Sequence, residues 1–251
     1  KSIHGILIVD DVGRYLGILT NKDLLFENNL LKKINEVMTQ KENSIISKPG
    51  ISIETAKEIM KQNKVEKLPL VDDNGILKGL ITAKDLLRIE HFPNATKDQK
   101  GKLLVGAAIG VKGDYLERAE KLLEAGCDVL MVDIAHGHSQ LCINAIKSLK
   151  DKFGDVQVIA GNVVTSEATA DLINAGADCV KIGIGSGSTC LTRIVAGSGV
   201  PQFTALLDCA KVGKDYSVPI MADGGICGLS GNFAKAIAAG ASSVMIGSLF
   251  A

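Results

Sequence analysis

The chain has 251 residues, with 28 Lys and Arg balanced by 28 Asp and Glu, so its formal net charge is zero. This balance argues against a nucleic-acid partner or an anionic membrane surface, and no apolar run reaches the roughly 18 residues that a membrane span needs. Hydrophobic residues make up 46% of the chain and aromatic residues only 4%, which suits a parallel α/β sheet covered by helices.

The six cysteines form no C-x-x-C pair and have no zinc-ligand spacing with the four histidines. With no recognisable secretory signal, this usage predicts a reducing, cytoplasmic setting in which most thiols are small buried side chains. The chain begins without Met and ends beside an apolar run, so we expect it to be incomplete at both ends.

Residues 1–91 contain an internal repeat with an offset of 62 residues. Residues 5–25 and 67–87 are identical at 10 of 21 aligned positions. Each copy has two apolar runs around a D-D-x-G turn and then T-x-K-D, which predicts a β-hairpin leading into a helix. Residues 52–63 carry apolar side chains at helical spacing and are a predicted helix.

This repeat resembles the paired CBS (cystathionine-β-synthase-type) module through the pattern G-h-h-T-x-x-D at residues 17–23 and 79–85. The resemblance implies that residues 1–91 are a regulatory pair with a truncated first copy. It also implies an adenine or guanine nucleotide near Thr20, Asp23, Thr82 and Asp85, since hydroxyls and helix-start amides hold phosphate and carboxylates hold ribose. Alternatively, these residues only cap their helices and occupy the first turn.

A polar linker at residues 92–100 precedes a change of pattern to alternating strand-like and helix-like segments. Helices are expected at residues 115–124 and 167–175, and strands are expected to begin near Leu103, Val129, Val156, Val180, Pro219 and Val244. Regular alternation predicts a parallel sheet. Six such units, against the eight of a closed (β/α)8 TIM barrel, predict that residues 92–251 are a partial barrel into which the repeat is inserted.

The longest connection, residues 183–200, directly follows a strand, where parallel α/β folds place their chemistry. Its three glycines allow backbone atoms to approach a ligand closely. Cys190 lies in this loop rather than in a core, and an anion-binding loop can lower the pKa of a neighbouring thiol. We therefore predict that Cys190 is a nucleophile and that the other cysteines are inert.

Residues 181–202 are similar to the catalytic loop of inosine monophosphate dehydrogenases, G-[IM]-G-[PS]-G-S-[IV]-C-x-T, which the related guanosine monophosphate reductases share. Residues 222–226 match the family's ribose motif and residues 245–248 its second phosphate motif. Residues 132–139 and 161–165 resemble two further strand-end motifs. The resemblance covers essentially the whole chain, including the inserted pair.

The resemblance implies a reaction that oxidises inosine monophosphate (IMP) to xanthosine monophosphate, the committed step of guanine nucleotide synthesis. Cys190, beside Thr192, would attack C2 of the purine, hydride would pass to NAD, and water would hydrolyse the thioimidate. Phosphate would lie against Ser188, Gly225, Gly247 and Ser248. Asp223 would accept both ribose hydroxyls, although a turn residue before Gly-Gly is the alternative.

On the cofactor side, the resemblance implies contacts from Asp133, Asn162, Gly183 and Gly185, with Thr192 nearby. Asp133 could instead cap the following helix. A potassium ion would be bound by the backbone carbonyls of Gly185, Gly187 and Cys190, because carbonyls suit weakly hydrated cations. The family also implies a homotetramer.

Several positions depart from the family pattern. Ile134 replaces Ser or Thr, Thr189 replaces Ile or Val, and the stretch at residues 227–230 is one residue longer. The family's Arg-Tyr flap does not occur in this sequence, so we expect hydride transfer without efficient hydrolysis from these residues alone.

Two alternatives remain open at this point. A guanosine monophosphate reductase usually lacks the inserted pair, reads T-T-R-K where residues 191–194 read L-T-R-I, and has Asn-Gly where this chain has His136-Gly137. These three differences favour the dehydrogenase. The other alternative is an inactive nucleotide-binding regulator of the same fold.

Overall fold

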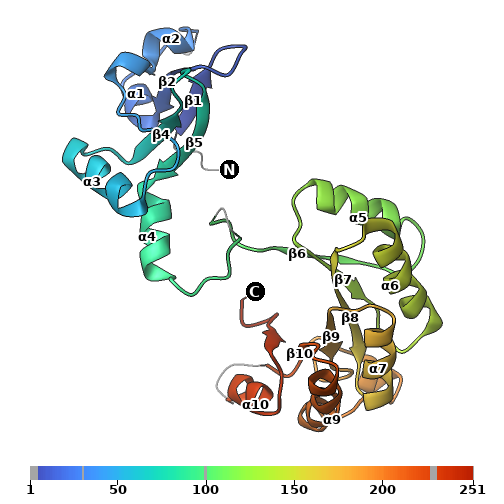
Figure 1. Ribbon diagram of the computed structural model, residues 1–251. Coiled ribbons are helices and arrows are strands. Elements are labelled where there is room, and N and C mark those ends of the chain that lie inside the picture. The colour runs from blue at the N-terminus through green and yellow to red at the C-terminus, as the bar shows by residue number, and fades with distance from the viewer. Residues whose placement is uncertain (1–4, 30, 99–100, 227–230, 251) are drawn as a thin grey trace. The chain divides into compact units, whose positions relative to one another are not determined.

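A computed structural model describes residues 5–29, 31–98, 101–226 and 231–250 of the chain. The chain divides into two compact units, unit 1 at residues 1–95 and unit 2 at residues 96–251 (Figure 1). The division falls within the predicted linker. The stretch at residues 227–230, which includes Cys227, lies outside the described residues. Within the described ranges, no helix is both long enough and apolar enough to span a membrane.

Unit 1 contains the two predicted hairpin-and-helix copies and the helix between them. Its elements are β1 (Gly5–Val9), β2 (Tyr15–Thr20), α1 (Asn21–Leu24), α2 (Ile34–Val37), β3 (Thr39–Gln40), the 3-10 turn η1 (Lys41–Asn43), α3 (Ile53–Asn63), β4 (Lys67–Val71), β5 (Leu77–Thr82) and α4 (Ala83–His91). β1 pairs with β2, and β4 with β5, both antiparallel. The hairpin prediction is therefore confirmed, whereas the assignment of this unit as a CBS pair stays a prediction.

The same turn chemistry closes both hairpins. Asp10 Oδ1 accepts hydrogen bonds from the amides two and four residues further on, at 3.1 and 2.7 Å. Asp72 Oδ1 repeats the arrangement at 3.0 and 2.9 Å. An aspartate that accepts from its own following amides stabilises a tight turn, which explains why the D-D-x-G signal predicted these hairpins correctly.

The predicted helix at residues 52–63 begins one residue later than expected because Ser52 is its cap. Ser52 Oγ accepts a hydrogen bond from the Thr55 amide at 3.1 Å. The small core of unit 1 is formed by this helix, β4 and α4, through the buried side chains Ala56, Met60, Leu68 and Leu86.

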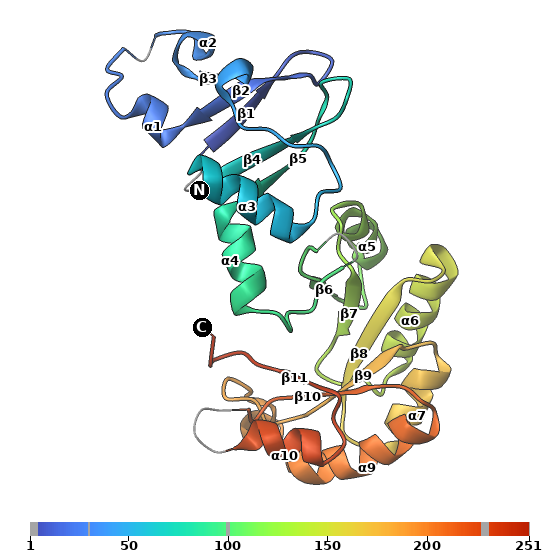
Figure 2. The same cartoon turned by 60° about the vertical axis from the view of Figure 1, so that its left-hand side comes forward.

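Unit 2 is a curled sheet of parallel strands with helices along one side (Figures 1 and 2). Its elements are β6 (Gly106–Ile109), α5 (Tyr115–Glu124), β7 (Val129–Asp133), α6 (Gln140–Phe153), β8 (Gln157–Val163), α7 (Ser166–Asn174), β9 (Cys179–Ile182), α8 (Thr192–Val195), α9 (Gln202–Asp215), β10 (Ile220–Asp223), α10 (Asn232–Ala238) and β11 (Ser243–Met245).

The strands of unit 2 lie side by side in chain order, from β6 to β11, and every described pair is parallel. This order is that of a barrel wall, so the described part of unit 2 is a half-barrel and the prediction of six parallel strands is confirmed. Fully buried aliphatic side chains of strands and helices pack together at its core, including Leu130, Ile146, Val158, Leu172 and Ile182. The parallel arrangement brings the carboxyl ends of all these strands to one edge.

Candidate active site

The predicted site residues at the carboxyl ends of the strands do converge. Asp133 ends β7, Asn162 lies near the end of β8, and Asp223 ends β10. The parallel register places Gly161 beside both Asp133 and Lys181, so neighbouring strands end at the same level. This confirms the predicted meeting of Asp133, Asn162 and Asp223, while their roles stay predictions.

Lys181 lies at the centre of these residues, and sequence reasoning missed it. Its side chain is only 4% exposed, and its Nζ donates hydrogen bonds to Asp133 Oδ1 at 3.0 Å and to Asp223 Oδ2 at 2.6 Å. A third hydrogen bond goes to Asn162 Oδ1. The sequence did contain a signal for Lys181, because it is a lysine inside the apolar strand Cys179–Ile182. A buried ammonium group requires polar partners, so such a lysine indicates a polar cluster.

Further hydrogen bonds in this strand-end cluster fix the side chains of Asn162 and Asp223. The Asn162 amide nitrogen donates to Asp223 Oδ2 at 2.9 Å and to the Gly183 carbonyl at 2.7 Å. The alternative role of Asp133 as a helix cap is wrong, because Ser139 caps α6. Asp223 likewise directs its carboxylate at Lys181 and Asn162, which makes it more than a turn residue before Gly-Gly.

Two glycines allow the loop after β9 to approach the end of β10. Gly183 has φ +147°, and a Cβ there would lie 1.9 Å from the Asp223 carbonyl oxygen. Gly224 has φ +94°, and a Cβ there would lie 2.5 Å from Ser186 Oγ. Any side chain at either position would clash with backbone or loop atoms, so glycine at these two positions has a direct steric cause.

Gln202, another residue that the sequence did not single out, anchors the same loop. Its Oε1 accepts a hydrogen bond from Ser186 Oγ at 2.9 Å, and its Nε2 donates to the Ile182 carbonyl at 2.8 Å. Ser186 Oγ also lies 3.2 Å from the Asp223 carbonyl oxygen. The loop is therefore tied to β9, β10 and the start of α9 at once.

Cys190 is half-buried in this loop, at a turn in which its amide donates to the Gly187 carbonyl at 3.2 Å. Its Sγ lies 3.4 Å from Thr192 Oγ1. Hydrogen bonds from the Thr192 hydroxyl, and then from the backbone amides of Thr192 and Gly185, hold the pKa of the Cys190 thiol below its usual value. This environment favours the thiolate, which is the nucleophilic form of cysteine.

Three buried cysteines of unit 2, Cys142, Cys179 and Cys209, contrast with Cys190. Burial raises the pKa of Cys142 and of Cys179 to about 11, and burial also raises the pKa of Cys209. Such thiols stay protonated at neutral pH and have the properties of small apolar side chains.

The expected phosphate-binding serines lie close together although 60 residues separate them. Ser188 Oγ and Ser248 Oγ are 3.4 Å apart. Gly247 is exposed beside Ser248, and the carbonyl of Gly225 accepts a hydrogen bond from Asn232 at 2.6 Å. Two adjacent hydroxyls are donors of the kind that a phosphate group requires.

For a monovalent cation, the loop offers the predicted backbone carbonyls of Gly185, Gly187 and Cys190. The Gly187 carbonyl already accepts the Cys190 amide, which leaves it one further lone pair. The described residues contain no cluster of three or more His, Cys, Asp or Glu side chains that could hold a metal ion. Potassium binding by these carbonyls stays a prediction.

One departure from the family pattern, Ile134, directly follows Asp133 at the end of β7. Ile134 packs against the apolar core of unit 2, so it adds no polar contact beside Asp133. His138 Nε2 lies 2.9 Å from Asp171 Oδ2 on α7, and that contact ties this ring to a helix.

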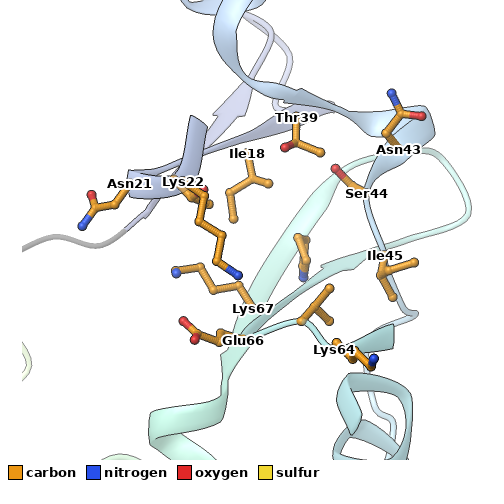
Figure 3. Close-up of a pocket in the computed structure, with 13 residues that line it drawn as sticks. Ile18, Asn21, Lys22, Thr39, Asn43, Ser44, Ile45, Lys64, Glu66 and Lys67 are labelled. Atoms are coloured by element: carbon orange, nitrogen blue, oxygen red, sulfur yellow. The ribbon is translucent and has the colours of Figure 1, made fainter. Parts of the chain in front are cut away.

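Unit 1 contains a pocket of about 340 Å³ (Figure 3). Lys22 extends from one wall towards Lys67 on the other, and Glu66 lies beside Lys67. The lining residues are Ile18, Thr20, Asn21, Lys22, Thr39, Asn43, Ser44, Ile45, Lys64, Val65, Glu66, Lys67 and Pro69. Three lysines around a partly apolar pocket suit a ligand that combines an anionic group with a flat apolar one.

Of the four residues expected to bind a regulatory nucleotide, only Thr20 lines this pocket. The hydroxyl and amide of Thr20 donate to Asp23 Oδ2 at 2.7 and 2.6 Å. Thr82 and Asp85 form the same capping box, with the corresponding distances 2.6 and 3.2 Å. All four residues thus have the capping role that was the alternative interpretation, and nucleotide binding near them stays a prediction.

Comparison with known proteins identifies the family of the chain. A family model described as the IMP dehydrogenase / GMP reductase domain matches residues 23–251. Inosine-5′-monophosphate dehydrogenase from Nitrosopumilus maritimus is 53% identical over 249 residues, which is 99% of this chain and 52% of that protein. The Bacillus subtilis protein of the same name is 49% identical over 251 residues, 99% of this chain and 51% of its own length.

Solved structures agree with this result. GMP reductase from Trypanosoma brucei in complex with guanosine 5′-triphosphate has a TM-score of 0.87 and 44% identity, covering 98% of this chain and 59% of that one. A variant of that reductase with guanosine 5′-monophosphate has a TM-score of 0.87 and 43% identity, covering 98% and 52%. This chain spans about half the length of the curated relatives it matches. With the half-barrel and its strand-end cluster already in place, the matches establish that the chain belongs to the IMP dehydrogenase / GMP reductase family.

Proposed function

We propose that the protein oxidises IMP to xanthosine monophosphate by a covalent mechanism at Cys190. The observation that carries this proposal is the position of Cys190, whose thiol pKa is lowered by hydrogen bonds, in a loop tied to the polar cluster around Asp223. A nucleophile next to a carboxylate that can recognise ribose fits a reaction on a nucleotide base. The names of the curated relatives support the same reaction.

In this mechanism, the Cys190 thiolate forms a bond to C2 of the purine, and the C2 hydrogen leaves with its electron pair. NAD is the acceptor of that hydride. Attack of water on the resulting thioimidate then releases xanthosine monophosphate and restores the thiol. The Cys190 thiol donates to Thr192 Oγ1 at 3.4 Å, and once the thiol is ionised the same hydroxyl can donate to the sulfur and stabilise the thiolate.

The binding roles follow the geometry of the strand ends. Ser188 and Ser248, with the backbone of Gly225 and Gly247, would hold phosphate, and Asp223 would accept the ribose hydroxyls. The cofactor would lie against Asp133, Asn162, Gly183 and Gly185. The Asp133 side chain is 54% exposed, and its Oδ1 accepts the hydrogen bond from Lys181. The carbonyls of Gly185, Gly187 and Cys190 would bind potassium.

GMP reductase activity is the alternative, because solved GMP reductases resemble this chain over 98% of its length. Because these reductases match unit 1 as well as unit 2, the presence of unit 1 does not separate the two activities. The loop at residues 191–194 and the pair His136-Gly137 still favour the dehydrogenase. An inactive regulator is disfavoured by the loop position of Cys190 beside Thr192, an arrangement that nucleotide binding alone does not need.

The experiment compares two assays on the full-length protein. We expect IMP and NAD to yield NADH and xanthosine monophosphate, and we expect guanosine monophosphate with NADPH to yield no ammonia. The reverse pattern would assign a reductase, and inactivity in both assays with retained IMP binding would assign a regulator. Light scattering of the same sample tests the homotetramer that family membership suggests.

Unit 1 has a proposed role of its own, the binding of an adenine or guanine nucleotide in the pocket lined by Lys22, Lys64 and Lys67. Lysine ammonium groups bind phosphates as point charges. Calorimetric titration with ATP and GTP tests this, and we expect Lys67→Ala to weaken binding about tenfold. Lys48→Ala is the matched control, because Lys48 pairs with Asp73 outside the pocket. Equal affinity in all three proteins would contradict the proposal.

A further inference from the structure

The strand-end cluster contains one buried cation and two carboxylates that belong to different proposed subsites. Lys181 is 4% exposed and contacts Asp133 on the cofactor side and Asp223 on the ribose side. Asn162, which is assigned to the cofactor side, also contacts Asp223, but it carries no charge. A single ammonium that hydrogen-bonds to both carboxylates can set their positions together.

The hydrogen bonds of Asp223 show what this arrangement does to the carboxylate. Its Oδ2 accepts from Lys181 Nζ at 2.6 Å and from Asn162 Nδ2 at 2.9 Å. An ionised carboxylate has about four lone-pair sites, two on each oxygen, so these bonds occupy Oδ2. Within the described part of the chain, Oδ1 has no recorded protein partner. The rotation of the carboxyl plane, which is otherwise soft, is fixed by the two bonds to Oδ2.

We propose that Lys181 is a positioning residue that holds Asp223 so that Oδ1 alone receives the ribose hydroxyls, and that holds Asp133 for the cofactor. This inference rests on the proposed function. Lys181 does not touch the nucleotide in this scheme. Its effect on ribose recognition passes through Asp223. Asn162 contacts both Lys181 and Asp223, and so holds the ammonium group next to the carboxylate.

Lys150, a partly buried lysine of the same unit, provides a matched control. Lys150 Nζ contacts Asp178 Oδ2 at 2.6 Å and the Val156 carbonyl at 2.8 Å, with a side chain that is 23% exposed. Val156 precedes β8 and Asp178 precedes β9, so this ion pair lies at the amino ends of the strands. Removing it tests the loss of a partly buried lysine in the same unit without touching the candidate site.

The experiment measures the dissociation constants of IMP and of 2′-deoxy-IMP for the full-length protein. We expect the unaltered protein to bind IMP at least about tenfold more tightly, since a hydroxyl bonded to a carboxylate is lost in the deoxy analogue. The Asp223→Asn variant shows how far the preference for IMP over 2′-deoxy-IMP falls when the ribose contact is lost. Lys181→Met should reduce the preference by about tenfold as well and should raise KM for NAD, whereas Lys150→Met should leave both values unchanged.

If Lys181 has a merely structural role, its substitution should weaken the binding of IMP and of 2′-deoxy-IMP by the same factor. The ratio of their dissociation constants would then stay unchanged, and that result would overturn the inference. Lys181→Gln repeats the test with a neutral donor if the Met variant does not fold, and Lys181→Arg, which keeps the charge, should restore part of the preference. Equal binding of the two nucleotides by the unaltered protein would remove the ribose role of Asp223 and the inference with it. Failure of the unaltered protein to bind IMP at all would instead overturn the proposed function on which the inference rests.

Discussion

The two units of this chain use polar side chains in opposite ways. In the repeated motifs of unit 1, hydrogen bonds join residues two to four positions apart, as in the turns at Asp10 and Asp72 and the capping boxes. In the strand-end cluster of unit 2, they join residues 19 to 61 positions apart. Local bonds of the first kind stabilise elements, whereas bonds of the second kind exist only once the sheet has formed and can therefore create a site.

This contrast predicts a separation of effects. Substitutions in the capping boxes of unit 1 should lower stability and leave catalysis intact. Apart from the buried Lys181, substitutions at the strand ends and in the loop of unit 2 should remove function at little cost in stability, because these side chains are partly exposed and lie outside the apolar core.

The largest effect is expected for Cys190→Ala in the full-length protein. Without a nucleophilic sulfur, formation of NADH from IMP should fall below detection, while IMP binding and the melting temperature should stay close to those of the unaltered protein. Cys127→Ala is the control, since Cys127 is a half-buried cysteine of the same unit. NADH production by the Cys190 variant would rule out the covalent mechanism.

The reactivity of the thiols should show the next largest effect. Because the pKa of Cys190 is lowered and that of Cys142 is about 11, the thiolate population at neutral pH should differ by about 100-fold or more. Peptide mass spectrometry after brief iodoacetamide treatment should find Cys190 alkylated first, with a rate that reaches half its maximum below pH 9. Saturating IMP should protect Cys190, and a lack of protection would contradict binding beside this loop.

Loss of one phosphate donor should have an intermediate effect. A hydrogen bond to a charged group contributes roughly 1.5–3 kcal/mol, so Ser248→Ala should weaken IMP binding by about ten- to a hundred-fold. Ser242→Ala, an exposed position before the same strand β11, serves as control and should leave the affinity unchanged. If both variants bind IMP like the unaltered protein, the phosphate lies elsewhere.

The smallest effects are expected in unit 1. Asp23→Ala and Asp85→Ala should each reduce the free energy of unfolding by up to about 1 kcal/mol, because each removes the N3 side chain of a capping box. The loss should be greater at Asp23, whose Oδ1 also accepts a hydrogen bond from Thr39 Oγ1 at 2.9 Å. Urea denaturation of unit 1 measures both values, and NADH formation without added nucleotide should not change.

The contribution of Asp23 should also depend on pH. Partial burial of its carboxyl opposes ionisation, but hydrogen bonds from Thr20 and Thr39 outweigh burial and hold its pKa below the usual range. A lowered pKa stabilises the fold above the unfolded-state pKa of about 4, and this stabilisation is lost as pH falls further. The difference between Asp23→Ala and the unaltered protein should therefore shrink on acidification. A constant difference would mean that the ionised carboxylate is not what stabilises this turn.

The sequence by itself determined the repeat, the position of the six strands, the loop that carries Cys190 and three members of the strand-end cluster. Turn residues, capping boxes and apolar periodicity act over a few positions, so their outcome can be read locally. β6 begins three residues later than expected at Leu103, and the other five strands begin within one residue of expectation.

Only the tertiary structure decided the roles of Lys181 and Gln202. In the sequence, Lys181 is one charged residue in an apolar strand and Gln202 is an ordinary residue after Pro201. Their partners come from neighbouring strands and from the loop, and the parallel register determines which side chains meet. A buried ammonium is stable only where carboxylates converge on it, and that convergence is a property of the curled sheet rather than of any segment within it.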